Sequence, residues 1–245
     1  MVGKTMKPRY LNHLKPQEIR SAIKENPLIL IPLGTTEWHA PHLPVGVDSL
    51  LSQAICADLS AQAGCVIAPP LATGICRNLT VSAGYFGTVE TIRNETLTAL
   101  LVDLGNGYAK LGFKTAAVLT GHFENDHWSA IKMAIHSLSA IRMVMLGAYD
   151  FLADKEQQLD SVEKTWPYAT DHAAEWETSM MLHYYPHLVD MEQAPEKIIL
   201  PMEDIPSYIH TRYPRRASPD YGKQLANATI EGGVRMINVL LAEIE

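Results

Sequence analysis

Residues 28–48 read Leu-Ile-Leu-Ile-Pro-Leu-Gly-Thr-Thr-Glu-Trp-His-Ala-Pro-His-Leu-Pro-Val-Gly-Val-Asp. The first six are apolar, as expected for a buried β-strand, and the glycines and prolines after them predict a shaped loop. Glu37 and His39 are two residues apart, so in extended backbone their side chains share one face. Carboxylates and imidazoles together are ligands for divalent metals. The alternative is a polar loop in which Asp48 caps the next helix.

Strands and helices alternate along the rest of the chain. Apolar runs predict further buried strands at 65–68, 115–120 and 143–146. Helical spacing of apolar residues predicts helices at 16–24, 48–63, 91–111, 126–140, 173–185 and 218–243. This alternation predicts an α/β fold with a mostly parallel sheet covered on both faces. With no repeat or long linker, we expect residues 1–245 to form one domain.

Charge, cysteine content and hydropathy argue against several classes of protein. The net charge of −7 and the lack of a Lys/Arg run argue against nucleic-acid binding. The three cysteines form no CxxC pair, as expected in a reducing compartment. No apolar run reaches about 18 residues, so no membrane span is predicted. Residues 1–15 lack the apolar segment of a signal peptide, and we therefore expect a cytoplasmic protein.

A second pair of candidate ligands follows the strand predicted at 115–120. His122 and Glu124 repeat the two-residue spacing of Glu37 and His39 in reverse order. Parallel strands end at the same edge of a sheet, where sites form, so neighbouring strands would bring these side chains together. A lone histidine at a strand end is more often structural, but buried charges need partners. With Asp48, the set could hold two divalent ions bridged by one carboxylate.

A third cluster, residues 171–177, opens a predicted helix. A histidine at a helix N-terminus has a lowered pKa, so His172 would be a neutral imidazole suited to acid–base chemistry. The alternative is helix capping by Asp171, with Glu175 and Glu177 complementing the helix dipole. Residues 153–171 are polar and irregular, and we expect them to form a lid.

Three motifs together resemble the creatininase (creatinine amidohydrolase) family over nearly the whole chain. They are residues 32–44 with Asp48, then Gly121-His-Phe-Glu-Asn125, then His172 with residues 177–182. The resemblance implies a three-layer α/β/α sandwich with two divalent ions, Zn²⁺ and/or Mn²⁺. It also implies a homo-oligomer, commonly a hexamer.

The resemblance also implies roles for individual residues. One ion would be held by Glu37, Asp48 and His122. The other would be held by His39, Asp48 and Glu124, with Asp48 bridging. His172 matches the catalytic histidine of the family, and Glu177 matches a carboxylate of the same motif.

The sequence motifs say less about the substrate than about the metal ligands. Tyr149 and Tyr168, with Trp166 nearby, stand where creatininase has tryptophans that close over the creatinine ring, so we expect these three side chains to bind substrate. The expected reaction is attack by a metal-bridging hydroxide on the carbonyl carbon of a small cyclic amide, with His172 protonating the leaving nitrogen. Two alternatives remain: hydrolysis of a carbon–carbon bond in a cyclic polyol diketone, or a metal-containing small-molecule binder without catalysis. The ligand set is carboxylate-rich and lacks cysteine, which favours an open catalytic site.

Overall fold

The centre of the fold is a parallel sheet. The computed structural model describes residues 6–89, 92–147, 172–199 and 211–244. Within them, five parallel strands follow the order β1-β3-β2-β4-β5. Their bounds are β1 Arg9–Tyr10, β2 Leu28–Leu33, β3 Val66–Ile67, β4 Thr115–Thr120 and β5 Arg142–Gly147. A separate antiparallel pair joins β6 (Ile198–Ile199) to β7 (Thr211–Arg212).

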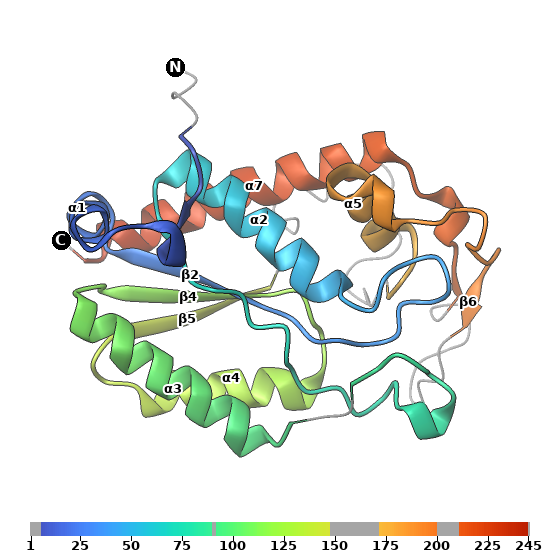
Figure 1. The fold of residues 1–245 in the computed structure, drawn as a ribbon, viewed down its shortest axis with the longest axis horizontal. Coiled ribbons are helices and arrows are strands. Elements are labelled where there is room, and N and C mark those ends of the chain that lie inside the picture. The colour runs from blue at the N-terminus through green and yellow to red at the C-terminus, as the bar shows by residue number, and fades with distance from the viewer. Residues whose placement is uncertain (1–5, 90–91, 148–171, 200–210, 245) are drawn as a thin grey trace.

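Helices cover both faces of the sheet (Figure 1). On one side lie α2 (Val47–Ala63), α5 (Glu175–Tyr184) and α7 (Pro219–Ala242), and on the other α3 (Asn94–Leu111) and α4 (Asn125–Ser137). Helix α1 (Pro16–Glu25) precedes β2 and lies at the amino ends of the strands. Short 3-10 turns occur at Leu11–His13, Val81–Ala83, Pro186–Leu188 and Pro214–Arg216. The predicted α/β/α sandwich with a parallel sheet is confirmed.

The apolar run in β2 serves two cores at once. Leu28 and Leu30 pack among the side chains of α2, α5 and α7, whereas Ile29 and Ile31 pack with those of α3 and α4. All six residues of β2 are buried. A strand covered on both faces needs apolar side chains at every position, which explains why this segment shows no alternation.

Glycines at the ends of β2 and β4 place the first turn of α2. A Cβ at Gly34 would lie 2.4 Å from the backbone nitrogen of Ser49, and one at Gly121 would lie 2.3 Å from the carbonyl oxygen of Asp48. Both strand ends therefore contact the start of α2 at distances that only glycine permits. The helix has Gly46 as its N-cap, without a side-chain cap. Asp48 therefore lies in the first turn of α2 and is not its N-cap, so the alternative prediction of a capping role is wrong.

Several predicted bounds differ from the structure by two or three residues. Helices α3 and α5 begin at Asn94 and Glu175, later than expected, and the two-residue strands β1, β6 and β7 were not predicted. A strand of two residues is too short to show the hydrophobic pattern from which strands are predicted. The start of α7 agrees with expectation, since Ser218 Oγ accepts a hydrogen bond from the backbone N–H of Tyr221. The expected lid lies outside the described residues.

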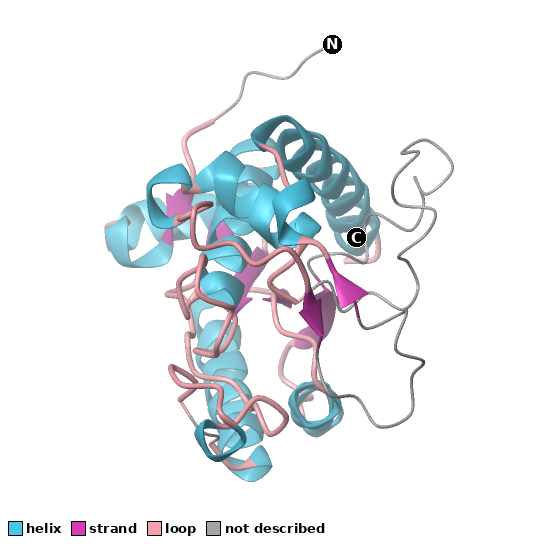
Figure 2. Cartoon of the chain, turned by 90° about the vertical axis from the view of Figure 1, so that its right-hand side faces the viewer, coloured by secondary structure: helices cyan, strands magenta, loops and turns pink. Residues whose placement is uncertain are grey.

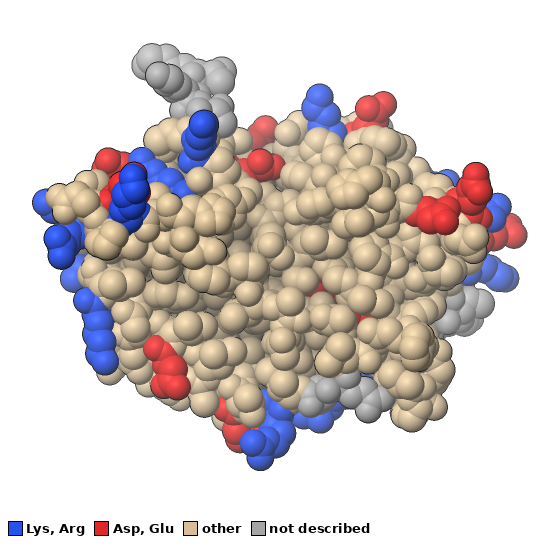
Figure 3. Space-filling model, in the orientation of Figure 1, with Lys and Arg blue, Asp and Glu red and all other residues tan. Residues whose placement is uncertain are grey.

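The face of the molecule shown in Figures 1 and 3 has few charged side chains near its centre. Figure 3 shows lysine, arginine, aspartate and glutamate side chains mainly around the margin of this face. In the part of the chain that the structure describes, no helix is long and apolar enough to cross a membrane. The expected lack of nucleic-acid partners stays a prediction.

The contact between α5 and α7 provides a test of the packing. A Cβ at Gly222 would lie 1.9 Å from the carbonyl oxygen of Ser179. We expect Gly222→Ala to lower the free energy of unfolding by about 1–3 kcal/mol or more, because backbone must move to admit the methyl group. In Gly107→Ala, a matched control, the methyl group meets no atom within 4 Å. The control should raise stability by about 0.5–1 kcal/mol through helix propensity. Urea denaturation of both variants measures this, and equal effects would contradict the packing.

Candidate metal centre

Acidic and imidazole side chains converge at the carboxyl ends of β2 and β4, the side of the molecule that faces the viewer in Figure 2. Glu37 and His39 come from the loop after β2, Asp48 from the first turn of α2, and His122 from the loop after β4. The Nδ1 atom of His122 lies 3.2 Å from both Glu37 Oε1 and Asp48 Oδ2. The Nε2 atom of His39 lies 3.3 Å from Asp48 Oδ1. All four side chains are buried.

Three sets of possible ligand atoms lie together in the described residues. One is Glu37, His39 and His172, and the other two overlap at one carboxylate. Of these two, the first, called here the Glu37 group, is Glu37, Asp48 and His122, and the second, the His39 group, is His39, Asp48 and Glu177. Within each group the possible ligand atoms lie within 4.8 Å of one another. The two oxygens of Asp48 face different groups, Oδ1 toward His39 and Oδ2 toward His122. This arrangement suits two neighbouring cations that share Asp48.

Backbone carbonyls orient His39 and His122 and also the neighbouring His172. His39 Nδ1 lies 3.0 Å from the carbonyl oxygen of Glu37, His122 Nε2 lies 2.8 Å from that of Ile75, and His172 Nε2 lies 2.6 Å from that of Trp38. A carbonyl oxygen only accepts, so these ring nitrogens carry the hydrogen. The opposite nitrogen of each ring faces the carboxylates. Metal-ligating histidines are held in this way, with the second N–H bonded to a carbonyl or carboxylate.

The electrostatics of the cluster favour added positive charge. Burial alone would lower the pKa of His39, but Asp48, Glu177 and Glu37 outweigh it and raise the pKa to about 10. Burial likewise opposes the charged form of His122, yet Glu37 and Asp48 raise its pKa well above the usual value. Without a cation, both imidazoles would therefore bind protons to balance the buried carboxylates.

Two buried atoms test whether these residues fit a metal. Nε2 of His39 and Oδ2 of Asp48 make no hydrogen bond within the described part of the chain. Leaving such groups without a hydrogen bond in the interior is costly. Both belong to the overlapping groups, and oxygen and imidazole ligands are those that zinc and manganese accept. The residues present thus fit divalent ions.

Glu177, rather than Glu124, lies with His39 and Asp48 in the described residues. Both carboxylate oxygens of Glu124 accept from the backbone N–H of Arg77, at 3.0 and 2.9 Å. Its Oε2 lies 3.9 Å from His122 Nε2, the nitrogen already bonded to Ile75. Glu177 Oε2 instead lies 3.6 Å from His39 Nε2 and accepts from the backbone N–H of Ala173 at 2.6 Å. The structure therefore groups Glu177, and not Glu124, with His39 and Asp48.

His172 lies beside the cluster and is partly open to solvent. Its ring centroid is 4.2 Å from that of His39, and its Nδ1 lies 3.5 Å from Glu37 Oε1. Burial, and then the neighbouring His39, lower the pKa of His172 to about 4. The sequence predicted that a helix dipole would lower the pKa of His172. Helix α5 begins only at Glu175, so burial and His39 are the causes instead.

Several site contacts had no clear signal in the sequence. The Sγ atom of Cys76 lies 3.0 Å from Glu37 Oε2, and Trp38 stands between the rings of His172 and Tyr85. Only the position of Trp38 inside the quoted motif, between Glu37 and His39, could have suggested its role. The expected substrate-binding residues cannot be placed, because they lie outside the described residues: Tyr149, Trp166 and Tyr168.

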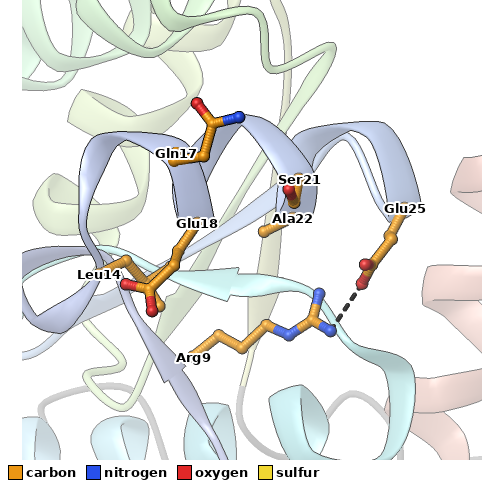
Figure 4. A pocket seen from close by; sticks show the side chains of 7 residues that line it. All are labelled: Arg9, Leu14, Gln17, Glu18, Ser21, Ala22 and Glu25. Carbon is orange, nitrogen blue, oxygen red and sulfur yellow. Dashed lines mark ion pairs between the residues drawn. The ribbon is translucent and has the colours of Figure 1, made fainter.

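A pocket at the other end of the molecule is separate from this cluster. It has a volume of about 280 Å³ and lies between α1 and β1 (Figure 4). Its arginine, Arg9, pairs with Glu25 at 2.6 Å and donates to the carbonyl oxygen of Gly64. The guanidinium is therefore already occupied by partners from the same chain.

The fold and the site together define an α/β/α protein with a candidate carboxylate–histidine metal centre at the strand ends. The creatininase family, described as creatinine amidohydrolase, matches residues 12–244. The chain therefore belongs to the creatininase family, whose members are hydrolases. A solved structure of creatinine amidohydrolase superimposes with a TM-score of 0.79 at 22% identity, covering 98% of this chain and 99% of that one. Similar solved structures include a manganese form and a zinc–zinc form of creatininase.

Relatives in this family act on different substrates. This chain is 31% identical to 3-dehydro-scyllo-inosose hydrolase of Thermotoga maritima, over 76% of this chain and 59% of that protein. It is 28% identical to creatinine amidohydrolase of Pseudomonas putida, over 68% and 67% of the two chains. It is 29% identical to the mycofactocin precursor peptide peptidase of Mycolicibacterium smegmatis, over 65% and 59%. The alignments with the Thermotoga and Mycolicibacterium proteins thus leave about two fifths of each relative unmatched.

The places of the two glutamates lead to a prediction. Glu177→Gln should weaken binding of one divalent ion, because it removes charge from the His39 group. Glu124→Gln, the matched control, should leave bound metal unchanged, because this carboxylate bonds to Arg77. Metal analysis after dialysis against limiting zinc measures both. Loss of metal in Glu124→Gln alone would contradict the arrangement.

Proposed function

We propose that this chain is a binuclear metal-dependent hydrolase that cleaves the C–N bond of a small cyclic amide. The observation that carries the proposal is the sharing of Asp48 between two ligand groups, with His172 beside them. The family to which the chain belongs and its likeness to a creatinine amidohydrolase support the reaction class.

Two divalent ions, Zn²⁺ and/or Mn²⁺, would be held by the Glu37 group and the His39 group. When bound there, such ions lower the pKa of a water molecule and polarise a carbonyl oxygen. The chain's own contribution is orientation: backbone carbonyls fix the rings of His39 and His122 so that one nitrogen of each faces the ions. Exclusion of bulk water from these buried side chains strengthens every charge interaction in the site.

Proton movement is assigned to two residues outside the Glu37 group and the His39 group. Nε2–H of His172 is bonded to the carbonyl of Trp38, so Nδ1 is the atom free to take a proton and pass it to the leaving nitrogen. Nδ1 faces the cluster at 3.5 Å from Glu37 Oε1. Glu124 is the second candidate, a largely buried carboxylate beside His122. Glu177 acts as a ligand that also anchors the turn before α5 through Ala173.

A flat substrate suits the aromatic side chains near the site. Trp38 lies nearly parallel to His172, with ring centroids 6.2 Å apart, and contacts Tyr85 edge-on at 5.1 Å. Stacking on these aromatic side chains would orient the planar ring of a substrate. Tyr149, Trp166 and Tyr168 stay predicted contributors to the same surface. Assembly into a homo-oligomer, by family a hexamer, also stays a prediction.

Hydrolysis of a carbon–carbon bond in a cyclic polyol diketone is the second candidate. The 31% identity to an inosose hydrolase favours it. The same activated water would attack a ring ketone, so the ligand groups do not separate the two reactions. The products do, because opening a cyclic amide gives a carboxylate and a new N–H group on one molecule, whereas cleavage of the diketone gives a carboxylate and a new C–H bond.

A substrate panel tests the proposal. We expect turnover of at least one cyclic amide among creatinine, hydantoins and lactams when zinc or manganese is present, with activity lost after chelation and restored by the metal. Turnover of ring diketones alone would favour the second candidate. The ring-opened product, which is heavier than its substrate by one water, is identified by mass spectrometry and NMR. Full activity in the metal-free protein would refute a metal-dependent hydrolase.

His172→Gln separates proton transfer from metal binding. The glutamine amide can still donate to the carbonyl of Trp38, but it has no nitrogen that exchanges protons near neutral pH. We expect kcat to fall about 10²–10⁴-fold with metal content unchanged. Metal analysis and steady-state kinetics of the same preparation measure this. Wild-type kcat in the variant would remove His172 from the mechanism.

A further inference from the structure

His127 is a buried histidine that the proposed reaction does not use. It lies in the first turn of α4, is fully buried, and belongs to none of the ligand groups. Its ring meets that of His122 edge-on, with centroids 4.9 Å apart and planes at 85°. A buried imidazole needs a hydrogen-bond partner for each ring nitrogen. The partners of His127 indicate its structural role.

The partners of His127 fix its hydrogen positions. The backbone N–H of Ile75 donates to His127 Nδ1 at 3.2 Å, and His127 Nε2 lies 3.1 Å from Thr120 Oγ1. An amide N–H only donates, so Nδ1 is the acceptor, and in the neutral ring Nε2 carries the hydrogen and donates to Thr120. Two segments far apart in the sequence are thereby joined through one ring.

Ile75 is held from both sides by histidines. Its N–H bonds to His127, and its carbonyl oxygen accepts from His122 Nε2 at 2.8 Å. The segment lies close against His127, because a Cβ at Gly74 would fall 2.9 Å from the Cε1 atom of His127. Thr120 Oγ1 also accepts from the backbone N–H of His122 at 3.1 Å. His127 therefore bonds to two residues that contact His122. Ile75 accepts from the His122 ring, and Thr120 accepts from the His122 backbone N–H.

We propose that His127 is a positioning residue for His122. By holding the N–H of Ile75, it places the carbonyl oxygen that His122 Nε2–H must reach, and this leaves Nδ1 of His122 facing Glu37 and Asp48 at 3.2 Å. The consequence for metal binding rests on the proposed function. Loss of His127 would weaken the ion in the Glu37 group and leave the ion in the His39 group unchanged.

Four variants test the inference. His127→Leu removes both hydrogen bonds. His127→Gln keeps an amide near the Thr120 contact but withdraws the acceptor from Ile75, whereas His127→Asn restores an acceptor near Nδ1. Asn26→Leu is the stability control, since Asn26 makes a similar pair of bonds, to Leu28 N–H and Ala63 C=O, at the opposite end of β2.

Zinc titration of the full chain against a competing chelator is the main measurement. The ion in the Glu37 group is identified by its loss in His122→Ala. We expect its dissociation constant to rise about 10–100-fold in His127→Leu and His127→Gln, as for other outer-shell partners of metal ligands. His127→Asn should stay near wild type, and Asn26→Leu should change neither constant. Unchanged zinc binding in His127→Gln, equal weakening of both ions, or the same loss in Asn26→Leu would overturn the inference.

A second readout does not depend on metal. NMR of ¹⁵N-histidine-labelled protein, recorded without metal, should show a slowly exchanging His122 Nε2–H in the wild type and in His127→Asn, and its loss in His127→Gln. If the wild type binds no zinc, the proposed function fails while this signal still decides the role of His127. A protected Nε2–H in every variant would overturn the inference.

Discussion

The site depends on the close contact of two strand ends with the first turn of one helix. Gly34 follows β2 and Gly121 follows β4, and at each position a Cβ would collide with the backbone of Asp48 or Ser49. Asp48 is therefore held between the loops that carry Glu37, His39 and His122. The two oxygens of one carboxylate then face two different ligand groups. Larger residues at the strand ends would push α2 outward and separate these groups.

The charges at this contact are stabilised by the backbone around them. Carbonyl groups hold His39, His122 and His172 in fixed orientations, so each ring turns one nitrogen toward the carboxylates. The chain bends sharply after two of these histidines. Ala40 and Ala173 have φ values of +60° and +55°, a region that non-glycine residues occupy at a cost of about 1–3 kcal/mol. Strain of this kind persists when the surrounding packing fixes the turn.

Much of this arrangement follows from the sequence. The apolar runs of β2 and β4 predict a covered parallel sheet, and the rule that sites form at carboxyl ends brings Glu37 and His39 near His122. The choice between Glu124 and Glu177 could not be predicted in this way. It depends on the packing of α5, where Thr178 bonds to His42 at 2.9 Å, and on the backbone N–H of Arg77 that binds Glu124. Contacts made by carbonyl groups, such as that of Ile75, leave no pattern in the side chains.

We propose that two cations share Asp48 between the Glu37 group and the His39 group. Anomalous diffraction at the zinc absorption edge, from crystals grown with zinc, measures this directly. We expect two anomalous peaks, one beside each oxygen of Asp48, with Glu177 next to the second. One peak only, or a second peak bound by Glu124 and remote from Glu177, would contradict it.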